Sequence, residues 1–287
     1  MEIEIAVAES LEDALERLER EGQELRPVAG ATDVMLRLRA GRMRARRLLS
    51  IADLGSLAFV RPSAEAIEIG ALTLVADLIG HPLLCAELPA AERAAADFAS
   101  PQIRNRATLG GNIGNASPAA DLVCALIALG ARVALQSRRG ARQMPLEELF
   151  TGPGLTVVGP DELIVAVRVP RQPGRHQSFA KFGNRCANAV ALVNMAMSLE
   201  VSGGQIRAAR VAYGCCAKVP LRARGVEAYL SGQPLDERLI AGVREAVLAD
   251  IRPIDDVRGS RRYKERLAIH ATEDALAQVL ERERRAA

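Results

Sequence analysis

Two short loops rich in small residues are the part of the sequence best suited to chemistry. One lies in "ATLGGNIGNASPAADLVCALIALGA", where Gly110, Gly111 and Asn112 precede a strongly apolar run. Glycines let a ligand approach the main chain closely, and amide N–H groups at the start of a helix attract anions. We predict that Ser117 caps the apolar helix, with Pro118 in its first turn. The stretch suggests a phosphate site, although a tight connection without any ligand is the more common meaning of such a turn.

The loop "VAGATDV" repeats this arrangement nearer the N-terminus. Ala29, Gly30 and Ala31 precede Thr32, which we predict as the N-cap of a helix that begins at Asp33. Two loops of this kind could hold one diphosphate from two sides. Neither is a P-loop, because no Lys follows, and "GGNIG" does not match the G-x-G-x-x-G fingerprint of a dinucleotide fold. The residue pattern alone predicts a phosphate cradle without identifying its ligand.

The composition excludes several classes of protein. The chain has 287 residues, of which 49% are hydrophobic, a mean hydropathy of +0.06 and a net charge of +3. These values predict a folded chain of one large or two ordinary domains. The small charge and the 3% of aromatic residues argue against a nucleic-acid partner. No apolar run approaches the roughly 20 residues of a membrane span, and the acidic, amphipathic N-terminus is unlike a secretory signal, so we expect a cytoplasmic protein.

The cysteines and histidines do not form a metal-binding pattern. Five cysteines and three histidines are scattered along the chain, and no C-x-x-C spacing occurs among them. We therefore expect buried, reduced thiols and no zinc, haem or iron–sulphur site in this chain.

The elements that would position the two loops alternate between helix and strand. We predict a helix over 10–21, a strand over 25–30, a helix that ends at Gly41 and a returning strand in "ARRLLSIADL", which together form a small β-α-β unit. Further along we predict a strand over 66–75, helices up to residue 99, a strand in "PDELIVAVRVP", and a hairpin of "AVALVNMAMSLEV" and "IRAARVAYGCC". Two helices close the chain, the second capped by Ser260. The fold class is α+β, with a domain boundary near residue 175.

Four ordered motifs resemble one family. "VAGATDVMLRLR", "SPQIRNRATLGGNIGNASPAADLVCALIALGA", "DELIVAVRVP" and "FAKFGNRCANAVALVNMAMSL" follow the order and spacing of the FAD-binding medium subunit of molybdenum hydroxylases, the xanthine dehydrogenase and carbon monoxide dehydrogenase family. The similarity continues to "VPLRARGVEAYLSG" and "DDVRGSRRYKER". It implies a two-part FAD-binding domain of the PCMH (vanillyl-alcohol-oxidase-like) type over 1–175. A smaller C-terminal α+β domain, an antiparallel sheet with helices, is implied over 176–287.

The resemblance also implies which loop residues bind FAD. The first family loop corresponds to Ala29, Gly30, Ala31, Thr32, Asp33 and Val34. The second corresponds to Thr108, Leu109, Gly110, Gly111 and Asn112. Both resemble the clamps on the FAD diphosphate, so the cofactor is expected to lie against their backbone.

Five side chains outside the two loops resemble further contacts of the cofactor. Asp121 resembles a carboxylate that holds the ribose of the adenosine, and Ser117 lies close to it in sequence. Phe98 aligns with an aromatic residue near the adenine, and Ile164 with an apolar residue near the cofactor; either is equally acceptable as an ordinary core residue. Lys181 resembles a lysine directed at the isoalloxazine ring, where a cation would stabilise the negative charge of reduced flavin; the alternative is a surface lysine.

The sequence departs from the family pattern at two places. Ala31 replaces the usual second glycine of the first loop, so we expect a backbone conformation there that is open to an L-residue. Asn188 stands where many relatives have an acid, which puts a charge pair in doubt.

The resemblance implies one step of an electron relay and no catalytic residue in this chain. FAD is expected to be noncovalent, because no His is suitably placed for a covalent link. The molybdenum cofactor and the 2Fe–2S clusters are expected only in partners, a molybdopterin large subunit and a 2Fe–2S small subunit, assembled as a dimer of heterotrimers. The segment Gln102, Ile103 and Arg104 is a candidate contact with the small subunit. Two alternatives are a self-contained flavin oxidase of the vanillyl-alcohol-oxidase type and a flavin-free assembly module.

Overall fold

The computed structural model describes residues 3–43, 47–185 and 187–286, which form two compact units. The first unit contains the described residues up to Leu78, together with Ser100–Ala116 and Ala131–Pro170. The second contains Ile79–Ala99, Ser117–Gly130 and the described residues from Arg171 onwards. Two stretches of the N-terminal half thus pack within the second unit. The division of the sequence into 1–175 and 176–287 stays a prediction.

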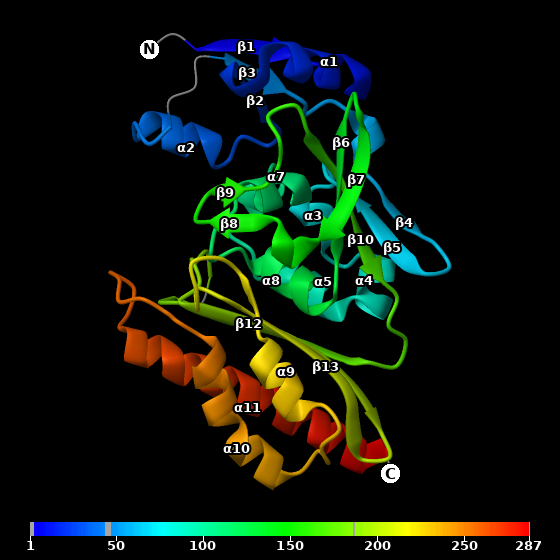
Figure 1. Cartoon of the computed structure of the whole chain (residues 1–287), viewed down its shortest axis with the longest axis vertical. Helices are drawn as coiled ribbons and strands as arrows, with labels where there is room; N and C mark the ends of the chain where they lie inside the picture. The colour runs from blue at the N-terminus through cyan, green and yellow to red at the C-terminus, as the bar shows by residue number, and fades with distance from the viewer. Residues whose placement is uncertain (1–2, 44–46, 186, 287) are drawn as a thin grey trace. The chain divides into compact units, whose positions relative to one another are not determined.

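The first unit begins with the predicted β-α-β arrangement. A parallel sheet has the strand order β1-β3-β2, and two helices pack on it (Figure 1). Leu49 packs with Leu18 on one face of the sheet, while its neighbour Leu48 packs with Leu38 on the other. The elements are β1 (Glu4–Val7), α1 (Leu11–Glu21), β2 (Leu25–Val28), α2 (Val34–Arg39) and β3 (Arg47–Ser50). The predicted helix over 10–21 is confirmed as α1, and Ser10 caps it.

The rest of the first unit is built on an antiparallel sheet of five strands. The strand order is β4-β5-β10-β6-β7. Its strands are β4 (Val60–Pro62), β5 (Ala66–Gly70), β6 (Arg132–Ser137), β7 (Gly140–Pro145) and β10 (Leu163–Pro170). Three short helices and a small strand pair accompany them: α3 (Val75–Leu78), α6 (Pro101–Arg104), α7 (Leu109–Gly114), β8 (Phe150–Gly152) and β9 (Leu155–Thr156).

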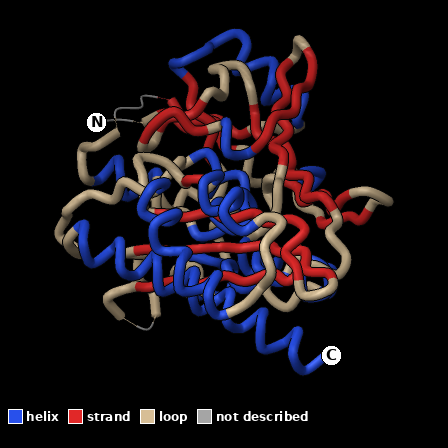
Figure 2. The backbone as a smooth tube through the Cα atoms, turned by 60° about the horizontal axis from the view of Figure 1, so that its bottom comes forward, coloured by secondary structure: helices blue, strands red, loops and turns tan. Residues whose placement is uncertain are grey.

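The second unit is an antiparallel four-stranded sheet with helices on both faces (Figures 1 and 2). The strand order is β11-β12-β13-β14. The strands are β11 (His176–Phe182), β12 (Val193–Ser202), β13 (Gln205–Gly214) and β14 (Leu221–Arg222). The helices are α4 (Pro82–Glu87), α5 (Pro89–Ala96), α8 (Asp121–Ala128), α9 (Arg224–Leu230), α10 (Glu237–Asp250) and α11 (Arg261–Ala286). The predicted hairpin and both closing helices are confirmed, whereas α9 was not predicted.

Strand β12 explains how this sheet can be covered on both sides. Val193, Met195 and Met197 point into the apolar core formed with α9, α10 and α11. The alternate residues Asn194 and Ser198 are equally buried but face the side of the sheet on which α8 lies. Side chains alternate along a strand, so a strand buried on both faces must place some residues among helices of each layer. Two of those on the α8 side are polar.

Two predicted helix starts are wrong. Helix α8 begins at Asp121 with Ala120 as its N-cap, and the Ser117 hydroxyl instead accepts a hydrogen bond from the Ala119 amide at 3.2 Å. Helix α2 begins at Val34, and Asp33 rather than Thr32 occupies the N-cap, without a side-chain hydrogen bond. Both predictions placed the helix start at the first residue type that favours an N-cap, but in each case the chain first passes through a turn.

Candidate functional site

The first loop, residues 29–34, presents backbone amides that donate to no residue the structure describes. Ala31 has a φ of +58°, a left-handed conformation that L-residues rarely adopt, so the expectation of a backbone conformation open to an L-residue is wrong here. Within the described part of the chain, the amides from Gly30 to Asp33 have no acceptor. Successive amides around a left-handed residue form a concave arrangement that binds anions. This loop can therefore accept a phosphate on its backbone.

The second loop is itself a helix, because Thr108 caps α7 and its glycines are helical. The amide of Leu109 donates to the Thr73 carbonyl at 3.0 Å, and that of Gly110 to the Ala71 carbonyl at 2.7 Å. The Gly111 amide donates to the Thr108 hydroxyl at 3.0 Å. These donors are already engaged, and a helix of six residues has only a small dipole. The second loop can therefore offer a ligand a surface to lie against, but its amides at 109–111 are not free to donate hydrogen bonds to it.

The two loops lie side by side in the first unit. A Cβ atom on Gly30 would lie 1.7 Å from the Arg106 carbonyl oxygen, so only glycine allows the first loop to reach the segment before α7. The Asn115 amide group, at the end of α7, donates to the Asp33 carboxylate. Ile164 of β10 lies beside the same helix, since a Cβ on Gly114 would be 3.6 Å from its Cδ1. The structure thus brings together the two loops and Ile164.

Two features of α7 remain open to a ligand. Gly111 is exposed, and a Cβ atom placed there would approach only the Thr108 hydroxyl, at 2.9 Å. The side-chain oxygen Oδ1 of Asn112 is buried and has no hydrogen-bond partner among the described residues. Gly110, in contrast, is explained by packing, because its Cβ would lie 2.7 Å from that of Ala71. A buried acceptor without a donor is costly, so Asn112 favours a ligand that carries hydroxyl or N–H groups.

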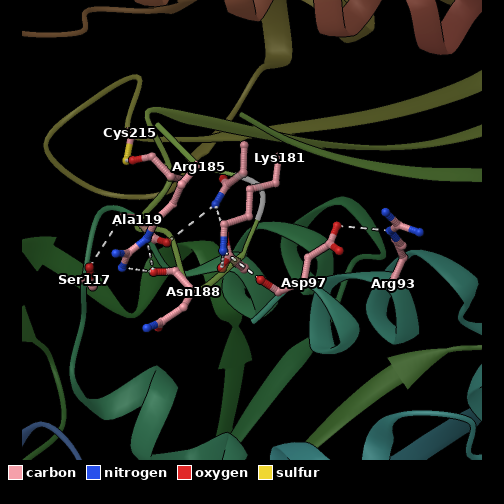
Figure 3. Close-up of polar contacts among 11 residues, drawn as sticks. Arg93, Asp97, Ser117, Ala119, Lys181, Arg185, Asn188 and Cys215 are labelled. Atoms are coloured by element: carbon pink, nitrogen blue, oxygen red, sulfur yellow. Dashed lines mark hydrogen bonds and ion pairs between the residues drawn. The ribbon is translucent and has the colours of Figure 1, made fainter. Parts of the chain in front are cut away.

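A buried ion pair occupies the second unit (Figure 3). The Lys181 ammonium donates to Oδ2 of Asp121 at 2.6 Å and to the Asp97 carbonyl at 2.8 Å. Only 8% of the Lys181 side chain and 6% of that of Asp121 are exposed. The alternative of a surface lysine is therefore wrong. The pair joins β11, the start of α8 and the end of α5, three segments that are far apart in the sequence.

Asn194 completes this cluster and was not predicted. Its Nδ2 donates to Oδ1 of Asp121 at 2.7 Å, so both carboxylate oxygens have a donor. Gly214 makes room for it, because a Cβ there would lie 2.1 Å from Oδ1 of Asn194. Burial raises the pKa of the Asp121 carboxyl, although Lys181 and Asn194 favour its ionised form. The signal in the sequence was the one amide side chain in the mainly apolar run "ALVNMAMSL".

The other predicted residues lie at the edges of this cluster or apart from it. Phe98 is half-buried and directly follows Asp97, and Ser117 lies in the turn before α8. Asn188 has a φ of +49°, and its carbonyl accepts a hydrogen bond from Nε of Arg185 at 2.8 Å (Figure 3). Cys186, which has no predicted role, lies outside the described residues. Over the described ranges, no group of His, Cys, Asp or Glu could hold a metal ion, and no helix is long and apolar enough to cross a membrane.

The conformation of Ala31 leads to a stability prediction. Ala31→Gly is expected to raise the free energy of unfolding by about 0.5–1 kcal/mol, because the strain of a left-handed alanine outweighs the greater entropy of glycine in the unfolded chain. Urea unfolding measures the change, with Ala40→Gly as the control, since Ala40 has a φ of −80°. The control should lower stability. A loss of stability in both variants would contradict the left-handed conformation at residue 31.

Comparisons with known proteins agree with this architecture. Residues 1–172 match the family described as the FAD binding domain in molybdopterin dehydrogenase, and residues 177–279 match the CO dehydrogenase flavoprotein C-terminal domain. The glyceraldehyde dehydrogenase medium chain of Sulfolobus acidocaldarius is 32% identical, and the alignment covers 95% of this chain and 96% of that protein. The xanthine dehydrogenase FAD-binding subunit of Escherichia coli O157:H7 is 30% identical, with 95% and 94% covered.

The solved structures lead to the same family. Carbon monoxide dehydrogenase from Hydrogenophaga pseudoflava superposes with a TM-score of 0.93 at 28% identity, and 96% of each chain is covered. The predicted fold, a two-part FAD-binding domain followed by a C-terminal antiparallel sheet with helices, is confirmed. These relatives favour the electron-transfer subunit over the self-contained oxidase and the flavin-free module. The chain belongs to the FAD-binding medium subunits of the molybdenum hydroxylases, a family of oxidoreductase complexes that includes xanthine and carbon monoxide dehydrogenases.

Proposed function

We propose that this chain holds FAD noncovalently and passes electrons from the 2Fe–2S clusters of a partner subunit to a terminal acceptor. The observation that supports this most directly is the run of unused amides from Gly30 to Asp33, beside α7 in the first unit. When bound, FAD would supply the ability to exchange electrons singly or in pairs. The residues described below hold it and set its electrostatic surroundings.

We propose that the first loop holds the diphosphate and that the second loop shapes the surface against it. The amides around Ala31 would donate to phosphate oxygens, with Thr32 and Val34 completing the loop. Thr108, Leu109 and Gly110 build α7, whose open face at Gly111 permits a close approach. Oδ1 of Asn112 is available to accept a hydrogen bond from a hydroxyl group of the cofactor. The residues present therefore fit FAD.

The proposed contacts from other elements are Phe98, Ser117, Asp121, Ile164 and Lys181. An ammonium has three N–H donors, and the described contacts of Lys181 use two of them. One donor is therefore left for the cofactor. We propose that Asp121 acts mainly by fixing Lys181, since each of its oxygens already accepts a hydrogen bond within the protein.

The relatives include the medium chain of a carbon monoxide dehydrogenase and a subunit of a dehydrogenase complex, which implies further subunits. We propose that these are a 2Fe–2S small subunit and a molybdopterin large subunit, assembled as a dimer of heterotrimers in the cytoplasm. The free thiols of Cys124 and Cys216, both fully buried, are compatible with a reducing compartment. We propose Gln102, Ile103 and Arg104 of α6 as a contact with the small subunit.

A precipitation experiment tests the noncovalent binding of FAD. The purified protein should show flavin absorption, and acid precipitation should release all of it into the supernatant, because no covalent bond is expected to hold it. Free FAD treated identically serves as the control for recovery. Yellow colour in the pellet would contradict noncovalent binding, and a colourless protein that takes up no added FAD would contradict the proposed function itself.

A further inference from the structure

The segment between α10 and α11, residues 252–260, is a loop (Figure 1). Charged groups fix its conformation. Asp256 is at its centre. Oδ1 of Asp256 accepts hydrogen bonds from the amides of Arg258 at 2.9 Å and Gly259 at 3.3 Å. Oδ2 of Asp256 binds the Arg258 guanidinium at 2.7 Å. We call this segment the 252–260 loop.

A buried lysine holds the same loop from beneath. Lys264, in the first turns of α11, is only 1% exposed. Its ammonium donates to the Ile254 carbonyl at 2.9 Å and lies 2.9 Å from Oδ2 of Asp256. Burying an ammonium is expensive unless it is paired, and both of its described partners belong to the 252–260 loop. The protein thus uses a buried charge to fix the conformation of a surface segment.

The fixed loop presents apolar side chains to solvent. Val257 is fully exposed and Ile254 is 67% exposed, and Tyr263 of α11 is 50% exposed nearby. The described large hydrophobic residues include none that is more exposed than Val257. Exposed apolar side chains on a fixed loop do not stabilise the isolated protein in water. A fixed conformation does lower the entropic cost of binding a partner.

A groove between α10 and α11 adjoins this loop. Its volume is about 720 Å³, and Asp255 and Ser260 of the loop contribute to its wall. Leu248 and Ile269 provide an apolar part of the lining. Three lining residues, Arg244, Arg262 and Arg266, form no ion pair with any residue that the structure describes; we call them the groove arginines. Apolar, Tyr and Arg side chains together are typical of the centre of a protein interface.

We propose that the 252–260 loop and the groove arginines form a docking surface for another polypeptide of the complex, one that presents carboxylates to the arginines and an apolar hollow to Val257 and Ile254. This inference rests on the proposed function in one respect, that the chain works together with other subunits. A second copy of the chain is a poorer occupant, because a symmetric contact would place the same excess of arginine opposite itself. A partner with acidic side chains removes that repulsion.

Binding of the co-purified remaining subunits to the FAD-loaded chain tests the surface. Val257→Asp adds a negative charge to a fully exposed position, and the double variant R262E/R266E reverses two of the groove arginines. Each is expected to weaken binding by about 10-fold or more. Two controls, Ile5→Asp at an exposed strand position and Arg282→Glu near the end of α11, should stay within about 2-fold. Raising the salt concentration should weaken the wild type more than R262E/R266E.

The outcomes separate this inference from the proposed function. If V257D and R262E/R266E bind the subunits as the wild type does, or if the wild type does not bind them at all, the docking surface is overturned. If V257D instead breaks up a dimer of the isolated chain, a second copy is the occupant and the proposal is also overturned. Flavin absorption reports separately on the proposed function. A wild type without flavin that still binds the subunits through these residues would refute FAD binding and support the docking surface.

Discussion

Replacing Lys181 with methionine is expected to lower the free energy of unfolding by about 3–5 kcal/mol, because it leaves the buried Asp121 carboxylate without its counter-charge. The double variant Lys181→Met with Asp121→Asn removes both charges and keeps an acceptor for Asn194. It is expected to lie within about 1–2 kcal/mol of the wild type, since replacing a whole buried ion pair costs far less than breaking it. Stability therefore depends on whether both charges of the pair are present or both are absent.

Urea unfolding of the flavin-free variants measures this difference, so that loss of FAD does not contribute. Lys218→Met is the control, because Lys218 is exposed and its loss should change the free energy by less than about 0.5 kcal/mol. A single variant as stable as the double variant would contradict the buried pair. Two equally unstable variants would instead show that packing, and not charge, fixes this cluster.

The pH dependence of the Lys181→Met variant gives an independent check. Burial already raises the pKa of Asp121 above the ordinary 3.8, and removing Lys181 takes away an interaction that lowers it. A carboxyl group whose pKa is higher in the folded state than in the unfolded state loses its stabilising contribution as the pH rises through the folded value. The deficit of the variant should therefore be small in acid, where Asp121 is protonated, and grow towards neutral pH. A deficit independent of pH would contradict this explanation.

The sequence identified Lys181 and Asp121 separately but did not predict that they pair. The family motifs give residue types at positions along the chain, and each was assigned a contact with the cofactor. Their contact depends on how α8 packs against β11 and β12, which is a tertiary feature without a local signal. Asn194 was missed for the same reason, because the alternation of a strand buried on both faces hides which side each residue faces. The available clue was an amide side chain in a strand of mainly apolar residues.

The elements were easier to predict than their ends. The hairpin of β12 and β13 follows from two long apolar runs around Gly203 and Gly204, both with positive φ. Helix α1 follows from its capping residue and apolar spacing. The starts of α2 and α8 could not be predicted, because the chain reaches each helix through a turn: around the left-handed Ala31 for α2, and after Ser117 for α8. Such turns are set by contacts between loops, here including the close approach of Gly30 to Arg106.

The sequence also did not distinguish the roles of the two adjacent glycines in the second loop. Gly110 and Gly111 are adjacent in one motif, yet Gly110 is required by packing against Ala71, whereas a Cβ on Gly111 would approach only the Thr108 hydroxyl. If FAD lies against this face, Gly111→Val should weaken its binding by on the order of 100-fold, equivalent to about 2.8 kcal/mol. The stability of the flavin-free protein should change by only about 1 kcal/mol, because the new side chain disturbs no more than the Thr108 cap.

Titration of the flavin-free protein with FAD measures the first effect, and urea unfolding the second. Thr108→Val is the matched control, since it removes the capping hydroxyl but leaves the space above Gly111 empty. The loss of affinity in Gly111→Val must exceed that of Thr108→Val by at least about 10-fold to implicate the open face, because a cap alone is worth about 1 kcal/mol. Equal losses in the two variants would mean that α7 serves only as a support for the first loop. The diphosphate would then be held by the amides around Ala31 alone.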